Sequence, residues 1–437
     1  MAEQRHVAVV GAGLAGLAAA LELQASGARV ELFERSRLLG GRATSFEIDG
    51  TEVDNGQHVF LACCTAFVDF ARRVGMEGHL YVQERFDALV LDRNGRAGRL
   101  RAGSLPAPLH LLASFARYPH LGIGGKLRIA RALLAGNGSA ATFEAWLQAC
   151  GQDAATRRAF WDPFFIPALN APFDRVSNRD AQFVLRTAFM RDAGAARFGF
   201  SKVPLARLAA AAAAQLDAVH RSTGVVGVAP AGERVELQLL DGRAAAFDGA
   251  VLAVPPKNLA KMLGDPQAYG VAGLEGFDAF PIVDVHLWHD AGSIGFDFAA
   301  ALESPLQWIF EKTAGYACCS FSAADEYLRV PAAELEALAW AEARAFVPAL
   351  RGARLLRSAS TRNPEATWLP RLGVRRPAQR TSVPQVAIAG AWTENGGWPD
   401  TMEAAVRSGV AAARVLGGRA SDRTGESRAE LVGRAAS

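Results

Sequence analysis

The N-terminal residues alternate short apolar runs with one longer stretch rich in Ala and Leu. Residues 6–10 (HVAVV) and 29–34 predict two buried strands, and residues 14–25 predict a helix between them that Ser26 and Gly27 end. The chain is therefore expected to open with a β-α-β unit.

The middle of the chain changes character twice. Residues 76–200 contain few strand-like runs and include amphipathic stretches at 127–134 and 143–150, so we expect a mainly helical insertion. An Ala-rich helix at 203–219 comes next. It is followed by a hairpin-like pair of runs, a turn and a strand closed by two prolines, at residues 225–228, 235–240, 241–242 and 250–256. These strands are expected to return to the domain that the first strands begin.

The C-terminal half predicts a second sheet and a return to the first domain. Strands are expected at 282–288, 306–310 and 317–321, with a long helix at 332–346. Residues 386–389 then predict a buried strand, and residues 402–416 predict a helix that Gly417-Gly418 ends. The polar residues 419–437 are expected to be a disordered tail.

Composition excludes several function classes. The 437 residues, half of them apolar, suffice for two cores, and 47 basic against 44 acidic residues give a net charge too small to indicate a nucleic-acid partner. Neither the five cysteines nor the eight histidines show metal-ligand or redox-pair spacing, and no window is long and apolar enough to predict a spanning helix. We expect a cytoplasmic protein without a metal.

The strongest motif follows the first predicted strand. Residues 11–16 (GAGLAG) have the GxGxxG spacing of a dinucleotide-binding turn. Gly11 permits the tight turn, Gly13 lets backbone approach a pyrophosphate, and Gly16 allows close helix packing, while the N–H groups from Leu14 and Ala15 onward face the phosphates. Glu34, 18 residues beyond Gly16, is expected to accept hydrogen bonds from the adenosine ribose.

Residues 34–42, with Glu34-Arg35 and Leu39-Gly40-Gly41-Arg42, resemble the motif of the flavin-containing amine oxidase and carotenoid desaturase superfamily. Residues 225–256 and 386–409 resemble two further segments of that superfamily. Many relatives carry an acid where Ala391 stands, so we expect the backbone of residues 390–392 to contact the flavin instead. The resemblance implies bound FAD, with contacts beyond the fingerprint at Arg35, Gly40, Gly41, Arg42, Gly56, Gln57, His58, Val226, Gly390, Ala391, Trp392, Thr401, Met402 and Ala405.

The same resemblance implies an α/β fold, with a Rossmann-like FAD-binding domain of the glutathione-reductase and amine-oxidase type and an inserted α+β substrate domain. Combined with the patterns above, it predicts a discontinuous FAD-binding domain at 1–75, 201–279 and 381–418. The substrate domain is predicted at 76–200 for its helical part and 280–380 for its sheet.

Three further segments resemble the bacterial hydroxysqualene dehydroxylases, also called squalene-associated FAD-dependent desaturases. They are residues 54–64 (DNGQHVFLACC), 161–170 (WDPFFIPALN) and 390–403 (GAWTENGGWPDTME). The resemblance implies that reduced FAD converts 12-hydroxysqualene to squalene, with loss of water, in a route towards hopanoids. No second GxGxxG follows a predicted strand, so the electrons are expected from a separate donor.

Removal of an allylic hydroxyl by protonation and hydride transfer requires an acid near the flavin. His58 is the first candidate, because it lies in the segment expected to pass under the flavin ring and its ordinary pKa is near neutrality. Asp54 and Asp162 follow. Each has a structural alternative: His58 bonds the flavin or a carbonyl, Asp54 bonds the backbone of its loop, and Asp162 caps a helix.

A positively charged reacting carbon favours aromatic faces and the exclusion of water. The expected substrate pocket consists of Trp161, Phe164, Phe165, Asn170, Trp392 and Trp398, although such rings are equally typical of a core. Residues 105–134 combine Leu, Phe and Ile with four basic residues. This segment predicts either a face that lies on the inner side of the cytoplasmic membrane or a helical lid on the substrate domain.

Three other functions remain open from the sequence. A carotenoid or dehydrosqualene desaturase would use the same flavin oxidatively. An amine oxidase is disfavoured, because that chemistry usually places a lysine near flavin N5 and the flavin-facing segments carry none. A non-catalytic prenyl-lipid binder, like the Rab escort proteins, is disfavoured by Arg42 and the Gly40-Gly41 pair, which a carrier does not need.

Overall fold

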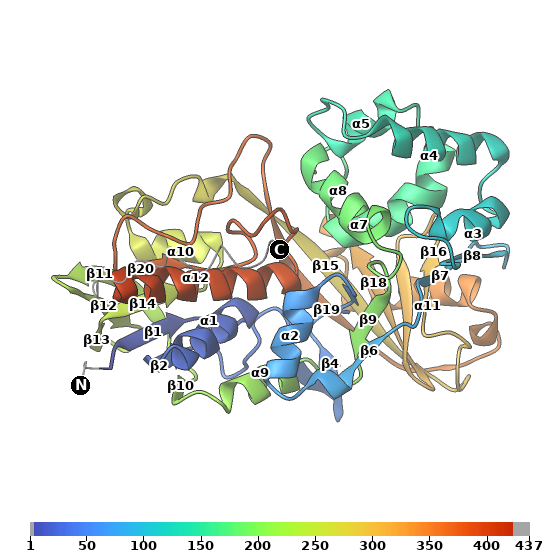
Figure 1. The fold of residues 1–437 in the computed structure, drawn as a ribbon. Coiled ribbons are helices and arrows are strands. Elements are labelled where there is room, and N and C mark those ends of the chain that lie inside the picture. Colours follow the sequence, from blue (N-terminus) through green and yellow to red (C-terminus); the bar gives the residue numbers. More distant parts are fainter. Residues whose placement is uncertain (1–3, 423–437) are drawn as a thin grey trace.

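The computed structural model describes residues 4–422. A parallel sheet organises one end of the molecule and a larger mixed sheet the other, and a lobe of helices covers part of the mixed sheet (Figure 1). The five cysteines are free thiols. Within the described residues, no helix is both long and apolar enough to cross a bilayer.

The parallel sheet is assembled from the beginning, the middle and the end of the chain. Its five strands pair in parallel in the order β10 (Ala218–His220), β2 (Arg29–Phe33), β1 (His6–Val10), β14 (Gly249–Leu252) and β20 (Val386–Ile388). Helices α1 (Leu14–Ala25) and α12 (Met402–Asp422) lie side by side against it (Figure 1). They pack so closely that a Cβ on Gly409 would lie 2.1 Å from the Ala15 carbonyl oxygen. The predicted β-α-β opening and the Rossmann-like fold are confirmed.

A smaller antiparallel sheet extends the same domain. It contains β11 (Val225–Ala231), β12 (Arg234–Leu239) and β13 (Ala244–Phe247), and α10 (Pro256–Leu263) begins at the predicted proline pair. The predicted hairpin is confirmed, and the turn at residues 241–242 leads into its third strand.

Two predicted helix bounds are wrong. The helix expected at 203–219 is only α9 (Ala206–Ala213), because residues 218–220 pair with β2 as an edge strand of the parallel sheet. The last helix continues through Gly417-Gly418 to Asp422, since a helical glycine costs only about 1 kcal/mol relative to alanine and does not force an end. Of the predicted tail, residues 419–422 are helical, and 423–437 lie outside the described residues.

The mixed sheet has seven strands. Their order is β19 (Leu355–Pro370), β15 (Phe277–His289), β18 (Tyr316–Ser322), β17 (Trp308–Thr313), β16 (Phe298–Ala301), β7 (Asp87–Leu91) and β8 (Ala97–Arg101). Helix α11 (Ala332–Phe346), predicted with the same bounds, packs on one face through Leu335, Ala339 and Phe346. The three predicted strands are confirmed, whereas β19 was not predicted.

The insertion between residues 76 and 200 is less purely helical than expected. It forms the helical lobe, but it also contributes β7 and β8 to the mixed sheet, and β6 (Leu80–Val82) and β9 (Phe198–Ser201) to a small sheet with β5 (Phe60–Leu61). The helices of the lobe are α3 (Leu112–Arg117), α4 (Ile123–Ala135), α5 (Phe143–Ala149), α6 (Ala154–Thr156), α7 (Asp162–Leu169) and α8 (Asn178–Leu185). A hairpin of β3 (Ser45–Ile48) and β4 (Thr51–Asp54), followed by α2 (Thr65–Arg73), links the lobe to the parallel sheet.

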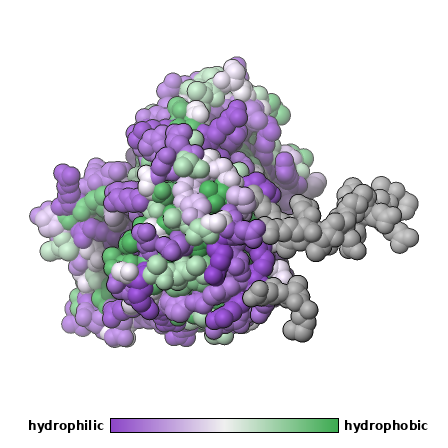
Figure 2. Space-filling model, turned by 90° about the vertical axis from the view of Figure 1, so that its left-hand side faces the viewer, coloured by the Kyte–Doolittle hydropathy of each residue, from purple (hydrophilic) through white to green (hydrophobic). Residues whose placement is uncertain are grey.

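The surface differs between the two ends of the molecule. Figure 2 views the end formed by the parallel and antiparallel sheets, where hydrophobic and hydrophilic residues are intermixed. Ten large apolar side chains are exposed in the described part of the chain, and six of them lie in the segment around α3 and α4, in the helical lobe: Leu105, Leu109, Leu112, Ile123, Leu127 and Leu134. Exposed apolar residues therefore concentrate on the lobe.

Candidate functional site

The glycine turn after β1 leaves no room for side chains at two of its positions. Gly11 has φ +99°, and a Cβ there would lie 2.5 Å from the Ala253 carbonyl oxygen. A Cβ on Gly16 would lie 1.8 Å from the Gly11 carbonyl oxygen. These two glycines let strand β1, helix α1 and the end of β14 approach one another.

The third glycine of the turn faces open space. Gly13 forms a parallel bridge with Gly40, and a Cβ on Gly13 would meet only the Gly41 Cα, at 4.0 Å. No side chain caps the N-terminus of α1, where Gly13 is the N-cap. Two glycine segments and a helix N-terminus thus form a backbone-lined cradle, which fits a pyrophosphate because N–H groups and the helix dipole favour an anion there.

Glu34 lies at the end of β2, beside this cradle. Its carboxylate is almost fully buried and accepts hydrogen bonds from the backbone N–H groups of Ala12 and Ser36, both at 2.8 Å. Arg35 is exposed, and Val226 lies at a bulge of β11 with 48% of its surface exposed. The acid is therefore fixed in position next to the dinucleotide turn, as the motif predicted.

Arg42 has a protein partner that the sequence did not suggest. Its guanidinium donates to both carboxylate oxygens of Asp400, at 2.6 and 2.9 Å, and to the Ala366 carbonyl. Burial lowers the pKa of Arg42 and the Asp400 charge raises it, with a net rise. This pair joins the Gly40-Gly41 segment directly to the segment that precedes α12.

The C-terminal segment folds as a tight loop between β20 and α12. Thr401 caps α12 by accepting a hydrogen bond from the Ala404 N–H, and the Ser408 hydroxyl accepts one from the Gly390 N–H. Ala391 is fully buried, and its carbonyl oxygen accepts hydrogen bonds from Arg376 and Asn395. The Ala391 carbonyl is thus bound within the protein, while Thr401, Met402 and Ala405 lie along the first turn of α12.

The segment after β4 brings the first two acid candidates together. Asp54 accepts hydrogen bonds from the Ser45 hydroxyl at 2.7 Å and the Leu205 N–H at 2.8 Å, so its side-chain partners belong to other segments and not to the backbone of its own loop. His58 Nδ1 lies 2.9 Å from the Gly56 carbonyl oxygen, and since a carbonyl only accepts, Nδ1 carries the hydrogen. Burial lowers the pKa of His58, with Asp54 opposing this effect. A neutral ring with a bare Nε2 is an acceptor rather than an acid.

Asp162 lies apart from these residues. It begins α7 and makes no capping hydrogen bond there; its buried Oδ1 has no hydrogen-bond partner and lies 4.0 Å from Arg157 Nε. Burial raises its pKa, and the charges that influence it, Arg157, Glu144 and Arg158, all belong to the helical lobe. The structure therefore does not bring the third acid candidate to His58 and Asp54.

A polar cluster on the mixed sheet faces the segment after β4, and the sequence analysis missed it. Lys312 of β17 donates to Gln57 Oε1 at 3.0 Å and lies 3.8 Å from Asp54 Oδ2. Beside it, Asp284 and His286 of β15 are almost fully buried. The signal was present in the predicted strand at 282–288 (IVDVHLW), where Asp and His alternate with buried Val and Leu and so share one face.

Lys312 bears on the expectation that this protein is not an amine oxidase. The flavin-facing segments contain no lysine of their own, but the mixed sheet brings Lys312 to them. The absence of such a lysine is therefore no longer an argument against amine oxidation.

The predicted substrate-pocket residues do not form one pocket. Trp161 and Phe165 are buried in the lobe, where they pack around Phe143, and Asn170 holds the lobe to the sheet through the Phe280 carbonyl and Thr367. Trp392 lies in the core beneath the parallel sheet, and Trp398 packs on Phe183 and Arg407. Two members of the set contact aromatic residues of mixed-sheet strands: Phe164 packs on Trp308 of β17, and Trp392 packs on Phe277 at the start of β15.

The aromatic surface of the mixed sheet lies next to its polar cluster. Phe298, Trp308 and Phe310 pack together on one face of β16 and β17, with Phe164 and Phe198 against them. These strand residues could not be assigned to one surface from the sequence, because the pairing register decides which residues of neighbouring strands lie side by side, and one sequence does not reveal that register.

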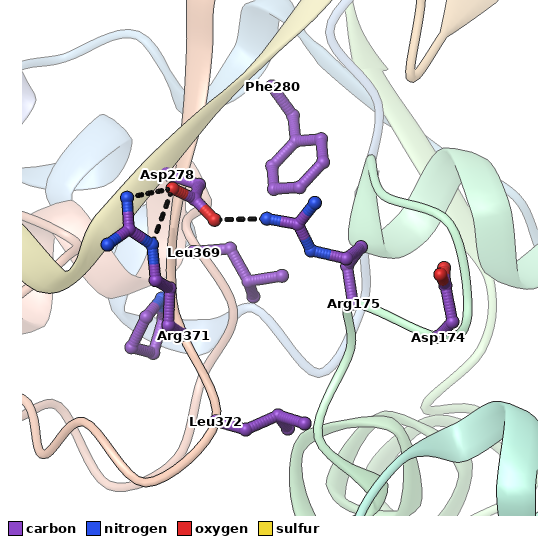
Figure 3. A pocket seen from close by; sticks show the side chains of 8 residues that line it. Asp174, Arg175, Asp278, Phe280, Leu369, Arg371 and Leu372 are labelled. Atoms are coloured by element: carbon purple, nitrogen blue, oxygen red, sulfur yellow. Dashed lines mark hydrogen bonds and ion pairs between the residues drawn. The ribbon is translucent and has the colours of Figure 1, made fainter.

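A separate pocket of about 320 Å³ lies between the loop after α7 and the ends of β15 and β19 (Figure 3). Its charged groups neutralise one another, because Asp278 accepts hydrogen bonds from both Arg371 and Arg175. None of the site residues predicted from the motifs lines it.

Comparison with known proteins agrees with this geometry. The chain is 29% identical over 438 residues to a hydroxysqualene dehydroxylase of Rhodopseudomonas palustris, covering 94% of this chain and 98% of that protein. A zeta-carotene desaturase of Zea mays is 30% identical, but over 36% of this chain and 31% of its own length. The structure of cyclohexylamine oxidase from Brevibacterium oxydans covers 96% of this chain and all of its own, with a TM-score of 0.71 and 18% identity, and shows the same fold.

The family model for flavin containing amine oxidoreductases matches residues 14–416, which include the mixed sheet, the helical lobe and all strands of the parallel sheet except β1. The chain belongs to this family of oxidoreductases, and its cofactor is FAD.

Proposed function

We propose that this flavoenzyme reduces 12-hydroxysqualene to squalene with loss of water. The observation that carries the proposal is the extent of similarity to the Rhodopseudomonas palustris hydroxysqualene dehydroxylase, which spans 94% of the chain. The match to the zeta-carotene desaturase of Zea mays covers 36% of the chain. Similarity over the whole chain includes the substrate domain, and the match to the Rhodopseudomonas palustris enzyme has that extent.

The chain's own residues would hold FAD in the backbone cradle. Gly13, Leu14 and Ala15 would bind the pyrophosphate with Gly40 and Gly41, and Glu34 would bind the ribose. The adenine would lie near Arg35 and Val226, and the flavin ring near residues 56–58 and the first turn of α12. When bound and reduced, FAD supplies a hydride to the carbon that loses its hydroxyl. Arg42, held by Asp400, would orient the segment between these two parts.

The aromatic surface of the mixed sheet would hold the polyene. Trp308 packs with Phe164 and Phe198, at ring-centroid distances of 6.1 and 5.6 Å. Such rings exclude water and offer π faces to positive charge on an allylic carbon. These rings belong to the same buried cluster as Trp161 and Phe165. We assign the substrate to them because their row of paired residues continues through Ser320 to the polar cluster beside residues 54–58.

The electron donor and the membrane are proposed partners. The described residues include one GxGxxG turn between a strand and a helix, so a separate donor would reduce the flavin. The exposed apolar residues of α3 and α4, together with exposed Arg117, Arg128 and Arg131, would place the lobe on an anionic membrane surface that supplies the lipid substrate.

The test is a single turnover under anaerobic conditions. Enzyme whose flavin has been photoreduced is mixed with 12-hydroxysqualene, and we expect the oxidised flavin absorbance to return with about one squalene formed per flavin. Stable reduced flavin and no squalene would refute the proposal.

The same preparation separates the alternative functions. Reduction of the oxidised enzyme by squalene or phytoene would indicate a desaturase, and reduction by amines would indicate an amine oxidase that uses Lys312. A folded, lipid-binding protein that is colourless and cannot be reconstituted with FAD would indicate a carrier.

A further inference from the structure

Residues 54–58, at the end of β4 and after it, are called the cofactor loop. One face of the mixed sheet places a carboxyl group between this loop and the aromatic surface. In the strand register, Asp284 of β15 pairs with Ser320 of β18, Ser320 pairs with Trp308 of β17, and Trp308 pairs with Ala300 of β16. Residues paired in this way lie side by side on one face. The row thus leads from Asp284 directly to the centre of the aromatic surface.

The cofactor loop approaches the same carboxyl from the other side. A Cβ on Gly56, which has φ +111°, would lie 3.3 Å from Asp284 Oδ2 and 3.8 Å from His58 Cε1. Only glycine fits this position without strain, because both the φ angle and the close contact exclude a side chain. Asp284 is therefore adjacent to the segment proposed to lie at the flavin ring, and it is 1% exposed to solvent.

We propose that Asp284 is the catalytic acid that protonates the leaving hydroxyl of the substrate. The proton passes from the Asp284 carboxyl to the hydroxyl oxygen, and the C–O bond breaks with its electron pair going to oxygen, so that water leaves. The allylic carbon then takes the hydride that the reduced cofactor supplies. One proton and one hydride enter, and squalene, water and the Asp284 carboxylate result. The assignment rests on the proposed function.

The surroundings of Asp284 are consistent with this role. Burial raises its pKa to about 6, against smaller lowering effects of Ser320, the Gln57 backbone, Lys312 and Cys318. The charged and titratable groups around it are His58 and Asp54 from the cofactor loop, Lys312 from β17, Tyr316, Cys318 and Cys319 from β18 and His286 on its own strand.

Most of these neighbours stay in one ionisation state near neutral pH. Burial lowers the pKa of His286 to about 4 and raises that of the Cys318 thiol, so the ring and the thiol are neutral. Burial also lowers the pKa of His58, whose Nδ1 hydrogen is bound to the Gly56 carbonyl. Asp284 therefore combines position with a transferable proton near pH 6.

The test compares single turnovers of the wild type, Asp284→Asn and Asp284→Glu between pH 5 and pH 8. In the wild type, the rate of squalene formation should fall about tenfold per pH unit above pH 6, because only the protonated carboxyl is active. Asp284→Asn should lose at least about a hundredfold in rate and the pH dependence with it. Asp284→Glu should recover part of the rate together with a falling limb. Asp278→Asn, on the same strand but in the ion pairs of Figure 3, is the matched control and should behave as the wild type.

A second readout does not depend on turnover. The folded-state pKa of Asp284 lies above its unfolded value, so burial of the ionised carboxylate destabilises the fold. This destabilisation is absent below about pH 4 and complete above about pH 6. In urea unfolding, Asp284→Asn should therefore exceed the wild type in stability at pH 8, and this difference should close towards pH 4. Asp278→Asn should show no such gain.

The outcomes are distinguishable. Wild-type enzyme that forms no squalene would overturn both the proposed function and the acid. Wild-type turnover with an unchanged rate and pH profile in Asp284→Asn would overturn the acid alone, and so would a stability difference that does not vary with pH. Loss of rate in Asp284→Asn with intact FAD binding, and recovery in Asp284→Glu, would support it.

Discussion

The three glycines of the GxGxxG turn after β1 are needed for different reasons. Gly11 and Gly16 are required by neighbouring backbone, since a Cβ on either would lie 2.5 Å or less from a carbonyl oxygen. Gly13 is not required by the protein, because a Cβ there finds space. The geometry thus separates a glycine that serves packing from one that serves the ligand.

This difference predicts opposite effects of two alanine substitutions. Gly16→Ala should lower the free energy of unfolding of the apoprotein by about 1–3 kcal/mol, the usual cost of overpacking. Gly13→Ala should leave that stability within about 0.5 kcal/mol and weaken FAD binding at least tenfold, about 1.4 kcal/mol. Urea unfolding and fluorescence titration with FAD measure the two quantities. Equal effects of both substitutions on stability would contradict this assignment.

At single residues, the GxGxxG spacing predicted the local geometry of the turn, whereas its contacts with FAD stay predictions. The positions of Gly11, Gly13 and Glu34 follow from a turn whose spacing is set by the β-α-β unit. The strand pattern at 282–288 marks Asp284 as a polar residue on one face, but the approach of Asp284 and Lys312 to the cofactor loop could not be predicted, because it depends on the pairing of β15, β18 and β17. The same limit applies to Trp308.

At the scale of elements, helix α12 supports helix α2 through one carboxylate. Glu403, in the first turn of α12, is buried and accepts hydrogen bonds from the N–H groups of Ala66 and Phe67 at 3.2 and 2.8 Å, and it pairs with Arg407. No side chain of α2 itself caps this end. The first turn of α2 thus depends on a residue more than three hundred positions away.

Glu403→Ala should therefore destabilise the protein by about 2 kcal/mol, since it leaves one buried and one partly buried N–H group without an acceptor. Glu47→Ala, on the exposed side of β3, is the control and should change stability by less than about 0.5 kcal/mol. Chemical unfolding followed by circular dichroism measures both. Similar midpoints for the two variants would show that the cap contributes little.

Prediction of elements depended on how apolar each one is. The strands at 6–10 and 386–389 and the helix at 332–346 were predicted because continuous or periodic apolar residues mark them. Strand β19 was missed because its partly exposed sequence, LLRSASTRNPEATWLP, mixes polar residues with a proline at 364. Its long pairing with β15 stabilises the extended conformation, which its composition alone does not favour.

At the scale of the whole molecule, the apolar surface is localised. Leu105, Leu109, Leu112, Ile123, Leu127 and Leu134 are exposed on the helical lobe, at the end of the molecule opposite to the antiparallel sheet (Figure 1). A membrane that bound this lobe would lie beside the domain proposed to hold the polyene.

The triple variant Ile123→Glu, Leu127→Glu and Leu134→Glu should therefore lose most binding to phosphatidylglycerol vesicles in a flotation assay. Its control carries the same three added charges at Leu240, Leu356 and Leu372, which are also exposed but lie outside the lobe. Because net charge changes equally, only the position of the substitutions differs. Equal flotation of the two variants would exclude the lobe as the membrane face.

Because the parallel sheet is assembled from distant segments of the chain, its neighbouring strands are synthesised at different times. Strand β1 emerges from the ribosome with its neighbour β2, but β14 and β20 follow only after residues 249 and 386 have been made. At typical rates of 5–20 residues per second, roughly 12 to 48 seconds separate β1 from β14, the strand that pairs with its second edge. During that interval the nascent N-terminal strand has an unpaired edge, so prompt shielding by a chaperone should govern the yield of native protein.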